Sequence, residues 1–340
     1  MNNGMKTIMA TILVATMVAG VLFMSGCVDP TEEEVTDVTV MMPFVPLPAW
    51  NVFYTAADQG YYADEGLNVS ITYTTFGTSD SLKQLAANNV DFAYGGDESV
   101  IIARSQDMPI VATQRVVQDN LFSVISKSES NITEIEDLVG KKVAAPGAGA
   151  TITIIMKAML YNAGLNPDDT EFVFVGAGVI PALAQDQVDA IGSYVPQTVI
   201  VQGMGYDIDI INASDYTTIG NTYVYTTETI IENNPEVVRK FVRATQRGLE
   251  HAIAHPDEAT DAYIKFNPDA AKDRDLNLEI WNGFVTEDTG GVFSKDVFEL
   301  PSEDNWVEKQ DTLYATGVIT EKTDVNKMFT DDFIIEIISE

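Results

Sequence analysis

The sequence predicts an α/β protein built from two similar lobes, each a mostly parallel sheet flanked by helices, with a ligand cleft between the lobes. Its 340 residues exceed a typical single domain of roughly 100–200 residues. From residue 38 onward, short β-type runs alternate with helical patterns, as in βαβ units. The pattern of apolar and acidic residues at 82–91 recurs at 180–189, which indicates two equivalent strand–helix–strand units.

The first part of the chain follows this alternation closely. Thr78 and Ser79 are plausible N-caps of a helix that carries Leu82 and Leu85 on one face. Gly66 follows an earlier helical pattern, and the pair of glycines at 95–96 predicts a turn after a strand. We therefore expect strands at 38–41, 69–73 and 90–94, a helix at 54–65, one from 78 or 79 onward and one from 97 onward.

The second part repeats the pattern and then becomes mostly helical. We expect helices at 133–139 and 151–163, strands at 142–145 and 171–175, a turn at 192–193 and a long amphipathic helix at 235–254. Shorter helices around Trp281, Trp306 and Phe329 are expected to complete the first lobe. The expected boundaries are 38–120 with 220–340 for lobe 1 and 121–219 for lobe 2, with crossover strands near 119–126 and 212–224.

The N-terminus has the features of an export signal. Lys6 precedes an apolar run at 8–24, and this run ends at Met24-Ser25-Gly26-Cys27, which resembles a lipobox. We expect residues 1–26 to be a lipoprotein signal peptide, Cys27 to be lipidated, and 27–37 to form an acidic linker. The protein would then lie at the cell surface or in the periplasm, anchored to the membrane. An uncleaved N-terminal anchor is the alternative.

The charge balance excludes one class of partner. The chain has 19 basic and 51 acidic residues, a formal net charge of −32. Nucleic-acid binding requires clustered Lys and Arg to neutralise phosphates, so we expect no nucleic-acid partner. The single cysteine cannot form an internal disulfide.

Several segments carry a family resemblance. They are Tyr54-Thr-Ala-Ala-Asp-Gln-Gly-Tyr-Tyr-Ala-Asp-Glu-Gly-Leu-Asn-Val69, Leu138-Val-Gly-Lys-Lys-Val143, the stretch 232–244, and His255-Pro-Asp-Glu-Ala259. In these segments the chain resembles solute-binding proteins of ABC importers, in the branch that includes nitrate-, sulfonate- and thiamine-pyrimidine-binding proteins. Segments 96–104 and 306–333 are most similar to the pyrimidine- and riboflavin-type members. Pro43 departs from the acid that pyrimidine-type relatives carry at this position, whereas Phe44 keeps the aromatic side chain.

The resemblance implies a type II periplasmic-binding-protein fold, a small-molecule ligand bound between closing lobes, and an ABC permease as partner. It further implies a monomer without a cofactor. The implied ligand is a planar heterocycle such as a thiamine-pyrimidine precursor or riboflavin. An anion such as an alkylsulfonate, taurine or nitrate is an alternative ligand. A cofactor-biosynthesis enzyme on the same fold is an alternative of another class.

The candidate ligand-binding residues lie in loops at the carboxyl ends of the expected strands, where open α/β sheets bind ligands. Aromatic rings can stack on a planar ligand, amides can recognise ring edges, and carboxylates can accept hydrogen bonds from an amine-bearing edge. The candidates are Phe44, Trp50, Asn51, Phe76, Gly77, Thr78, Gly96, Asp97, Glu98, Gln118, Asn120, Gly147, Gly149, Thr151, Tyr194 and Gln197.

Some of these candidates could instead have a purely structural role. Phe44 and Phe76 can be core residues, and Asp97 or Glu98 can cap the next helix. The glycines at 147 and 149 can cradle an anion or serve only the backbone conformation. Both histidines, at 251 and 255, belong to a helical stretch remote from these loops, so we expect no catalytic residue and no metal site.

Overall fold

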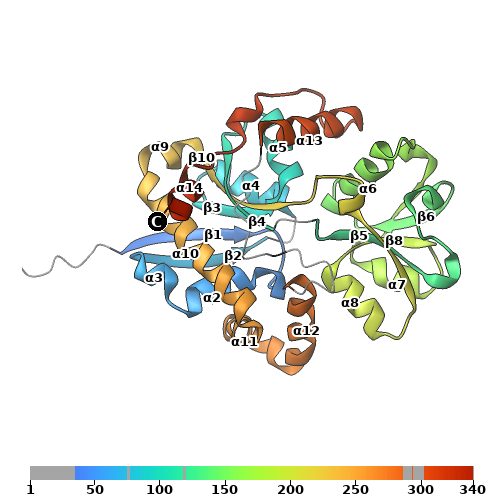
Figure 1. Ribbon diagram of the computed structural model, residues 1–340, viewed down its shortest axis with the longest axis horizontal. Coiled ribbons are helices and arrows are strands. Elements are labelled where there is room, and N and C mark those ends of the chain that lie inside the picture. Colours follow the sequence, from blue (N-terminus) through green and yellow to red (C-terminus); the bar gives the residue numbers. More distant parts are fainter. Residues whose placement is uncertain (1–34, 75–76, 118–119, 286–292, 294–301, 340) are drawn as a thin grey trace, which may run out of the picture. The chain divides into compact units, whose positions relative to one another are not determined.

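The computed structural model describes residues 35–74, 77–117, 120–285, 293 and 302–339. Thr36–Glu340 forms one compact unit. It contains two five-stranded sheets, each flanked by helices, as Figure 1 shows. The predicted α/β fold with two similar halves is confirmed. We call each sheet with the helices packed on it a lobe: lobe 1 contains the N-terminal strand and lobe 2 contains the sheet formed from the middle of the chain.

The sheet of lobe 1 has the strand order β2-β1-β3-β10-β4. The first three strands run parallel, and β10 is antiparallel to both of its neighbours. The first strand begins at Thr36, so residues 36 and 37 belong to the sheet and not to a linker. The strand bounds are β1 Thr36–Met42, β2 Leu67–Tyr73, β3 Phe92–Gly96, β4 Ile110–Val117 and β10 Thr222–Thr227.

The sheet of lobe 2 has the equivalent order β7-β6-β8-β5-β9, in which β5 is the strand antiparallel to both neighbours. In each sheet the antiparallel strand is the one that enters from the other lobe. It runs opposite to the other four strands of the sheet. Both sheets are therefore mixed. The bounds are β5 Phe122–Lys127, β6 Lys142–Ala145, β7 Glu171–Phe174, β8 Ala190–Tyr194 and β9 Ile208–Asn212.

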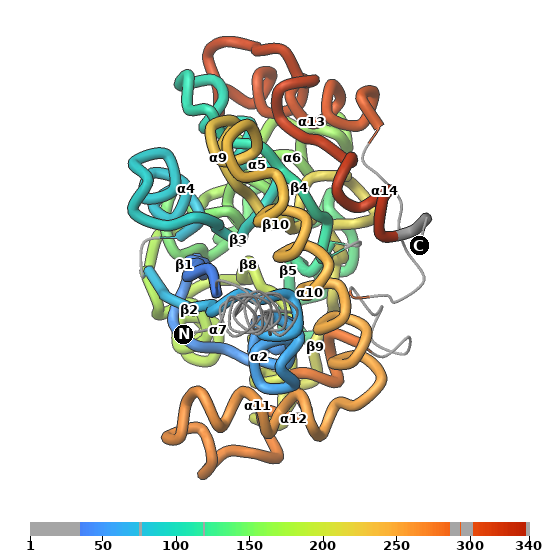
Figure 2. Tube along the Cα trace, turned by 90° about the vertical axis from the view of Figure 1, so that its left-hand side faces the viewer, coloured from blue at the N-terminus to red at the C-terminus, as the bar shows by residue number. Residues whose placement is uncertain are grey.

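The helices of lobe 1 cover the sheet with large apolar side chains. The long helix α10 runs along α2, as Figure 2 shows, and its Phe241 stacks on Phe92 of β3 at 4.0 Å between ring centroids. The helix bounds are α2 Asn51–Asp58, α3 Tyr61–Asp64, α4 Thr78–Ala86, α5 Asp97–Ser105, α9 Glu228–Asn233, α10 Pro235–Ala254, α11 Pro256–Phe266 and α14 Asp332–Ser339.

The helices α12 and α13 contact both lobes. Helix α12 packs on α11 in lobe 1 and on α8 in lobe 2, and α13 packs on α5 in lobe 1 and on α6 in lobe 2. The expectation that these C-terminal helices complete only the first lobe was therefore too narrow. The bounds are α6 Thr151–Asn162, α7 Val179–Ala184, α8 Val195–Gly203, α12 Arg274–Val285 and α13 Glu303–Ala315.

Three local expectations from the sequence were wrong in detail. The helix expected at 54–65 is two helices, α2 and α3, because Gly60 adopts a left-handed φ of 78° between them. The glycines at 95–96 and at 192 lie within β3 and β8 and not in turns. A Cβ on Gly95 would lie 2.1 Å from the Thr78 side chain, so this glycine allows α4 to approach the strand. At 133–139 only a short 3₁₀ helix, Ile135–Leu138, is formed.

Candidate functional site

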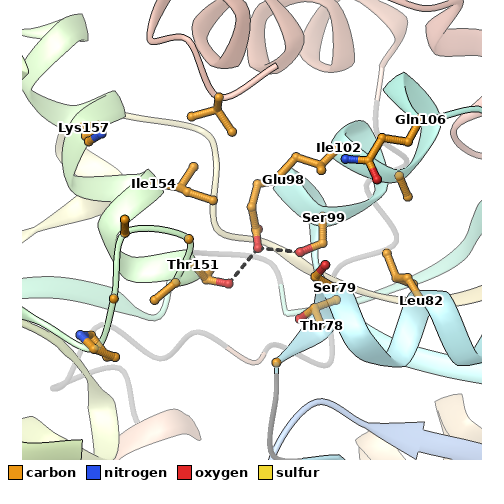
Figure 3. A pocket seen from close by; sticks show the side chains of 18 of the residues that line it. Thr78, Ser79, Leu82, Glu98, Ser99, Ile102, Gln106, Thr151, Ile154 and Lys157 are labelled. Carbon is orange, nitrogen blue, oxygen red and sulfur yellow. Dashed lines mark hydrogen bonds between the residues drawn. The ribbon is translucent and has the colours of Figure 1, made fainter. Parts of the chain in front are cut away.

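The candidate site is a cavity of about 720 Å³ bordered by both lobes, shown in Figure 3. Its lobe 1 side is formed by the first turns of α4 and α5, and its lobe 2 side by the loop after β6 and the first turns of α6. The structure brings together seven of the predicted residues in its lining: Phe44, Gly77, Thr78, Glu98, Gly147, Gly149 and Thr151.

Glu98 joins the two lobes across this cavity. Its side chain is fully buried, and its Oε1 accepts hydrogen bonds from Ser99 Oγ and from Thr151 Oγ1, both at 2.8 Å. Its second oxygen, Oε2, has no hydrogen-bond partner among the described residues. Burial first, and then the nearby Asp97 carboxylate, raise the pKa of Glu98 from its ordinary value of 4.5 to about 7. Glu98 therefore lines the cavity with a carboxyl group that has one oxygen without a partner among the described residues and a pKa of about 7.

The backbone before Glu98 is shaped to hold its carboxyl group. Gly96 is the N-cap of α5, so Asp97 and Glu98 do not occupy the capping position itself and both lie in the first turn of the helix. A Cβ on Gly96 would lie 2.2 Å from Glu98 Oε2. Glycine at this position therefore leaves room for the Glu98 carboxyl group as it lies in the structure.

Asp97, in contrast, is held by protein groups. Its Oδ2 accepts a hydrogen bond from Lys309 Nζ of α13 at 2.6 Å, and both side chains are fully buried. Its Oδ1 accepts a hydrogen bond from the Gly220 amide at 3.0 Å. Of the two neighbouring acids, Glu98 lines the cavity, whereas Asp97 is a structural group that ties α5 to α13 and to the segment before β10.

Asn120 connects the two segments by which the chain passes between the sheets. Its Nδ2 donates to the Ile219 carbonyl, and its Oδ1 accepts a hydrogen bond from the Phe122 amide at 3.0 Å. Gly220 has a φ of 129°, and a Cβ there would lie 2.3 Å from the Asn120 side chain. These contacts place Asn120 in the crossing region, and it is not among the residues that line the cavity.

The loop 147–151 presents its backbone to the cavity. Gly147 and Gly149 have no left-handed φ, and nothing lies within 4 Å of the position of a Cβ on either of them. Neither crowding nor an unusual backbone angle explains these glycines in the structure. Their effect is to keep the cavity wall open at the start of α6, where a ligand can approach the backbone closely.

The three aromatic and amide candidates at 44–51 have different surroundings. Phe44 is 44% exposed and lines the cavity, so it is not a core residue. Trp50 is buried against Tyr94, with 5.4 Å between ring centroids, and its Nε1 donates to the Val45 carbonyl at 3.0 Å. Asn51 is fully buried, and neither of its side-chain polar atoms has a hydrogen-bond partner among the described residues.

The remaining candidates lie away from the described lining or outside the described residues. Tyr194 and Gln197 lie at the junction of β8 and α8 in lobe 2, and burial raises the pKa of the Tyr194 hydroxyl. Neither of them is among the residues that line the cavity. Phe76, Gln118 and Cys27 lie outside the residues that the structure describes.

Several residues of the site were not predicted from the sequence. Ser99, Gln106 and Lys157 line the cavity, as does the loop 316–318. Helical spacing is a signal that could have found Gln106, which lies eight residues after Glu98. No local signal points to Lys309, because its partner Asp97 lies 212 residues away.

The described part of the chain contains no group of three or more His, Cys, Asp or Glu residues arranged to hold a metal ion. Over the same ranges, no helix combines the length and the apolar character that crossing a membrane requires.

Comparison with known proteins identifies the family. The family described as NMT1/THI5 like matches residues 48–259. The chain belongs to the NMT1/THI5-like family. Among curated proteins, it is 29% identical over 310 residues to the riboflavin-binding protein RibY of Chloroflexus aurantiacus, covering 87% of this chain and 86% of that protein. It is also 29% identical over 263 residues to the formylaminopyrimidine-binding protein of Halalkalibacterium halodurans, covering 75% of this chain and 79% of that protein.

This NMT1/THI5-like chain also has enzymes among its relatives. A 4-amino-5-hydroxymethyl-2-methylpyrimidine phosphate synthase of Saccharomyces cerevisiae is 26% identical over 250 residues, which covers 69% of this chain and 73% of the enzyme. Among solved structures, the periplasmic aliphatic sulphonate binding protein SsuA of Escherichia coli matches with a TM-score of 0.70 at 14% identity. The match covers 87% of this chain and 92% of the SsuA chain. This likeness confirms the periplasmic-binding-protein fold that the sequence predicted.

Proposed function

We propose that this protein is an extracytoplasmic solute-binding lipoprotein of an ABC importer, and that it binds a planar heterocycle between its two lobes. Two of its curated relatives are binding proteins for riboflavin and for a formylaminopyrimidine. The observation that carries the proposal is the cavity between the lobes, in which Glu98 of lobe 1 bonds to Thr151 of lobe 2. The predicted site residues in its lining are part of this proposal.

The proposed mechanism is closure of the lobes around the ligand. The chain passes between the sheets after β4 and before β10, and Asn120 links these two passages. Rotation about them would separate Glu98 from Thr151 and open the cavity. A ligand that contacts both lobes only in the closed state favours that state by its differential affinity. An ABC permease would then recognise the closed complex.

Calorimetric titration of the purified full-length protein with riboflavin and with formylaminopyrimidine tests this function. We expect at least one of them to bind, and we expect Glu98→Leu to weaken that binding at least ~10-fold, because the ligand loses a partly unsatisfied carboxyl acceptor. Glu308→Leu is the matched control, since Glu308 is an exposed residue of α13 outside the cavity lining. Absence of binding to either compound, together with binding of an alkylsulfonate, would contradict the proposal.

Membrane anchoring through Cys27 is a second part of the proposal and has its own test. Because a lipidated Cys27 would be the membrane attachment point, we expect Cys27→Ser to move the protein from the membrane fraction to the soluble fraction. Mass spectrometry of the N-terminal peptide should show a lipid on Cys27 in the wild-type protein. An unmodified cysteine behind an intact segment 1–26 would support the uncleaved anchor instead.

The alternative anion ligand is less well supported. The sulphonate-binding structures share the fold at 14–18% identity, which says nothing about the ligand. At the start of α6, where backbone amides could meet an anion, the Glu98 carboxyl group already accepts a hydrogen bond from Thr151. Lys157 is the one basic residue in the described lining.

The enzyme alternative is favoured by one specific observation, the similarity to pyrimidine phosphate synthases. His251 is engaged elsewhere in the structure: its Nδ1 bonds to the Tyr61 hydroxyl at 2.8 Å and its Nε2 to Glu258 at 3.0 Å. Neither histidine lines the described cavity, so the usual general base is not at the candidate site. Formation of a new product from any ligand that binds would favour the enzyme over the binding protein.

A further inference from the structure

Glu98 is the one acid in the described lining of the cavity, and hydrogen bonds hold it from both lobes. Its Oε1 accepts one bond from Ser99 Oγ of the same helix and one from Thr151 Oγ1 of α6, both at 2.8 Å, as Figure 3 shows. Ser99 belongs to lobe 1, whereas Thr151 belongs to lobe 2. Opening of the lobes would therefore keep the first bond, break the second and admit water to the carboxyl group.

The Glu98 carboxyl group has no cation beside it in the described part of the chain. Both bonds to Oε1 come from neutral hydroxyl groups, and Oε2 has no partner there. Lys309 of α13 pairs with Asp97, and Arg104 of α5 pairs with Glu228. A carboxylate that is buried without a cation is costly, so the structure favours the neutral, protonated form of Glu98.

The other titratable groups on the elements around Glu98 do not bind it. Arg115 donates to Asn221 Oδ1 at 3.0 Å, and the Tyr225 hydroxyl donates to the Gly96 carbonyl at 2.8 Å. None of these groups forms a hydrogen bond or an ion pair with Glu98 among the described residues. The groups are Asp80 and Lys83 of α4, Tyr94 of β3, Arg115 of β4, Lys157 of α6, and Tyr223 and Tyr225 of β10.

Burial outweighs the groups that favour the charged form of Glu98. The hydroxyls of Thr151 and Ser99 and the backbone amide of Glu98 lower its pKa, whereas burial and then the Asp97 carboxylate raise it, to about 7 in place of 4.5. Water that enters on opening would remove the effect of burial. In the open state the pKa of Glu98 should therefore return toward its ordinary value.

We propose that closing the lobes takes up one proton at Glu98, so that the closed state is the protonated state and ionisation of Glu98 favours the open state. This inference rests on the closure described under the proposed function and adds a proton to it. Between pH 4.5 and about 7, the open state has lost this proton and the closed state keeps it. Rising pH therefore favours opening, and a ligand that does not itself titrate in this range should bind more weakly as the pH rises.

The distance between the lobes in the ligand-free protein measures this coupling. Spin labels are placed at Ala87→Cys, directly after α4 in lobe 1, and at Asp168→Cys, in the short 3₁₀ helix Pro167–Asp169 of lobe 2. Both positions are exposed and lie outside the cavity lining. Cys27→Ser removes the native thiol. Double electron–electron resonance then gives the ratio of open to closed molecules at pH 5.5 and at pH 8.

We expect this ratio to rise roughly 25-fold between the two pH values, as follows from a pKa of 4.5 in the open state and about 7 in the closed state. Glu98→Gln keeps an acceptor for Thr151 but cannot ionise, so its ratio should be the same at both pH values. Glu308→Gln is the matched control, because Glu308 is an exposed residue of α13 outside the lining. It should show the rise of the wild type.

Two further variants test whether Glu98 acts across the lobes. Thr151→Val removes the hydrogen bond from lobe 2 and should raise the ratio of open to closed molecules at pH 5.5 about 2–10-fold, because one bond of ordinary net strength is lost only in the closed state. Ser99→Ala removes a bond to the same oxygen from lobe 1. That bond is present in both states, so this variant should keep the wild-type ratio.

The outcomes separate this inference from the proposed function. A wild-type ratio that changes with pH no more than the ratio of Glu98→Gln overturns the proton coupling and leaves a solute-binding protein. A distance between the lobes that does not shorten when riboflavin or formylaminopyrimidine binds overturns the closure on which the inference rests. Failure of both compounds to bind, with binding of an alkylsulfonate, overturns the proposed function itself.

Discussion

Replacing Lys309 with methionine is expected to lower the free energy of unfolding by about 3–5 kcal/mol, because it leaves the Asp97 carboxylate buried without its counter-ion. Both side chains of this pair are fully buried and lie 2.6 Å apart. The remaining partner of Asp97, the Gly220 amide at 3.0 Å, supplies a hydrogen bond but no full positive charge. Urea unfolding of wild type and variant, followed by circular dichroism, measures the difference.

Lys322→Met is the matched control for this prediction. Lys322 pairs with Asp311 at 2.7 Å, but both side chains are substantially exposed, so its loss should cost only about 0–1 kcal/mol. The double variant Lys309→Met, Asp97→Asn should recover much of the lost stability, because no buried charge is left without a partner. A Lys309 variant that is no less stable than the Lys322 variant would contradict the role assigned to this pair.

Replacing Glu98 with glutamine is expected to remove a pH dependence of stability. Below pH 4.5 the carboxyl is protonated in both the folded and the unfolded chain. As the pH rises from 4.5 to about 7, the unfolded chain loses this proton first, so the folded state is progressively destabilised. Above pH 7 the free energy of unfolding is lower by about 3 kcal/mol than below pH 4.5, as expected for this shift in the pKa of Glu98. Urea unfolding at pH 5 and pH 8 measures it.

Comparing the wild type with Glu98→Gln isolates the contribution of the Glu98 carboxyl group. Glu98→Gln keeps an acceptor for Thr151 but cannot ionise, so it should resemble the wild type near pH 5 and exceed it in stability at pH 8. Glu308→Gln, an exposed change, should follow the wild-type curve. If wild type and Glu98→Gln lose the same stability between the two pH values, the Glu98 carboxyl does not titrate in this range.

The fold could largely be predicted from the sequence because its signals are local. The apolar runs of β1 and β2 and the 3.6-residue period of Pro235–Ala254 are encoded within each segment. The repeat of residues 82–91 at 180–189 indicated two equivalent sheets, and their strand orders are equivalent. The errors arose where a backbone angle or a distant neighbour decides the structure, as at Gly60 and Gly95.

The candidate site was predictable in its location and only partly in its residues. Loops at the carboxyl ends of strands were expected to meet, and Phe44, Glu98 and Thr151 do line one cavity. The sequence did not distinguish Glu98 from Asp97, because both are acids at the start of the same helix. That distinction depends on Lys309, which only folding brings to Asp97.

The sequence by itself determined the family, the alternation of strands and helices and the loops that border the site, because each depends on residues close together in the chain. The tertiary structure alone decided which acid meets the cavity, which residues join the lobes and how large the cavity is. These properties depend on burial and on distances between residues far apart in the chain. Glu98 shows the reason most clearly, since the same carboxyl group would have an ordinary pKa in water and titrates near 7 only where folding has removed the water around it.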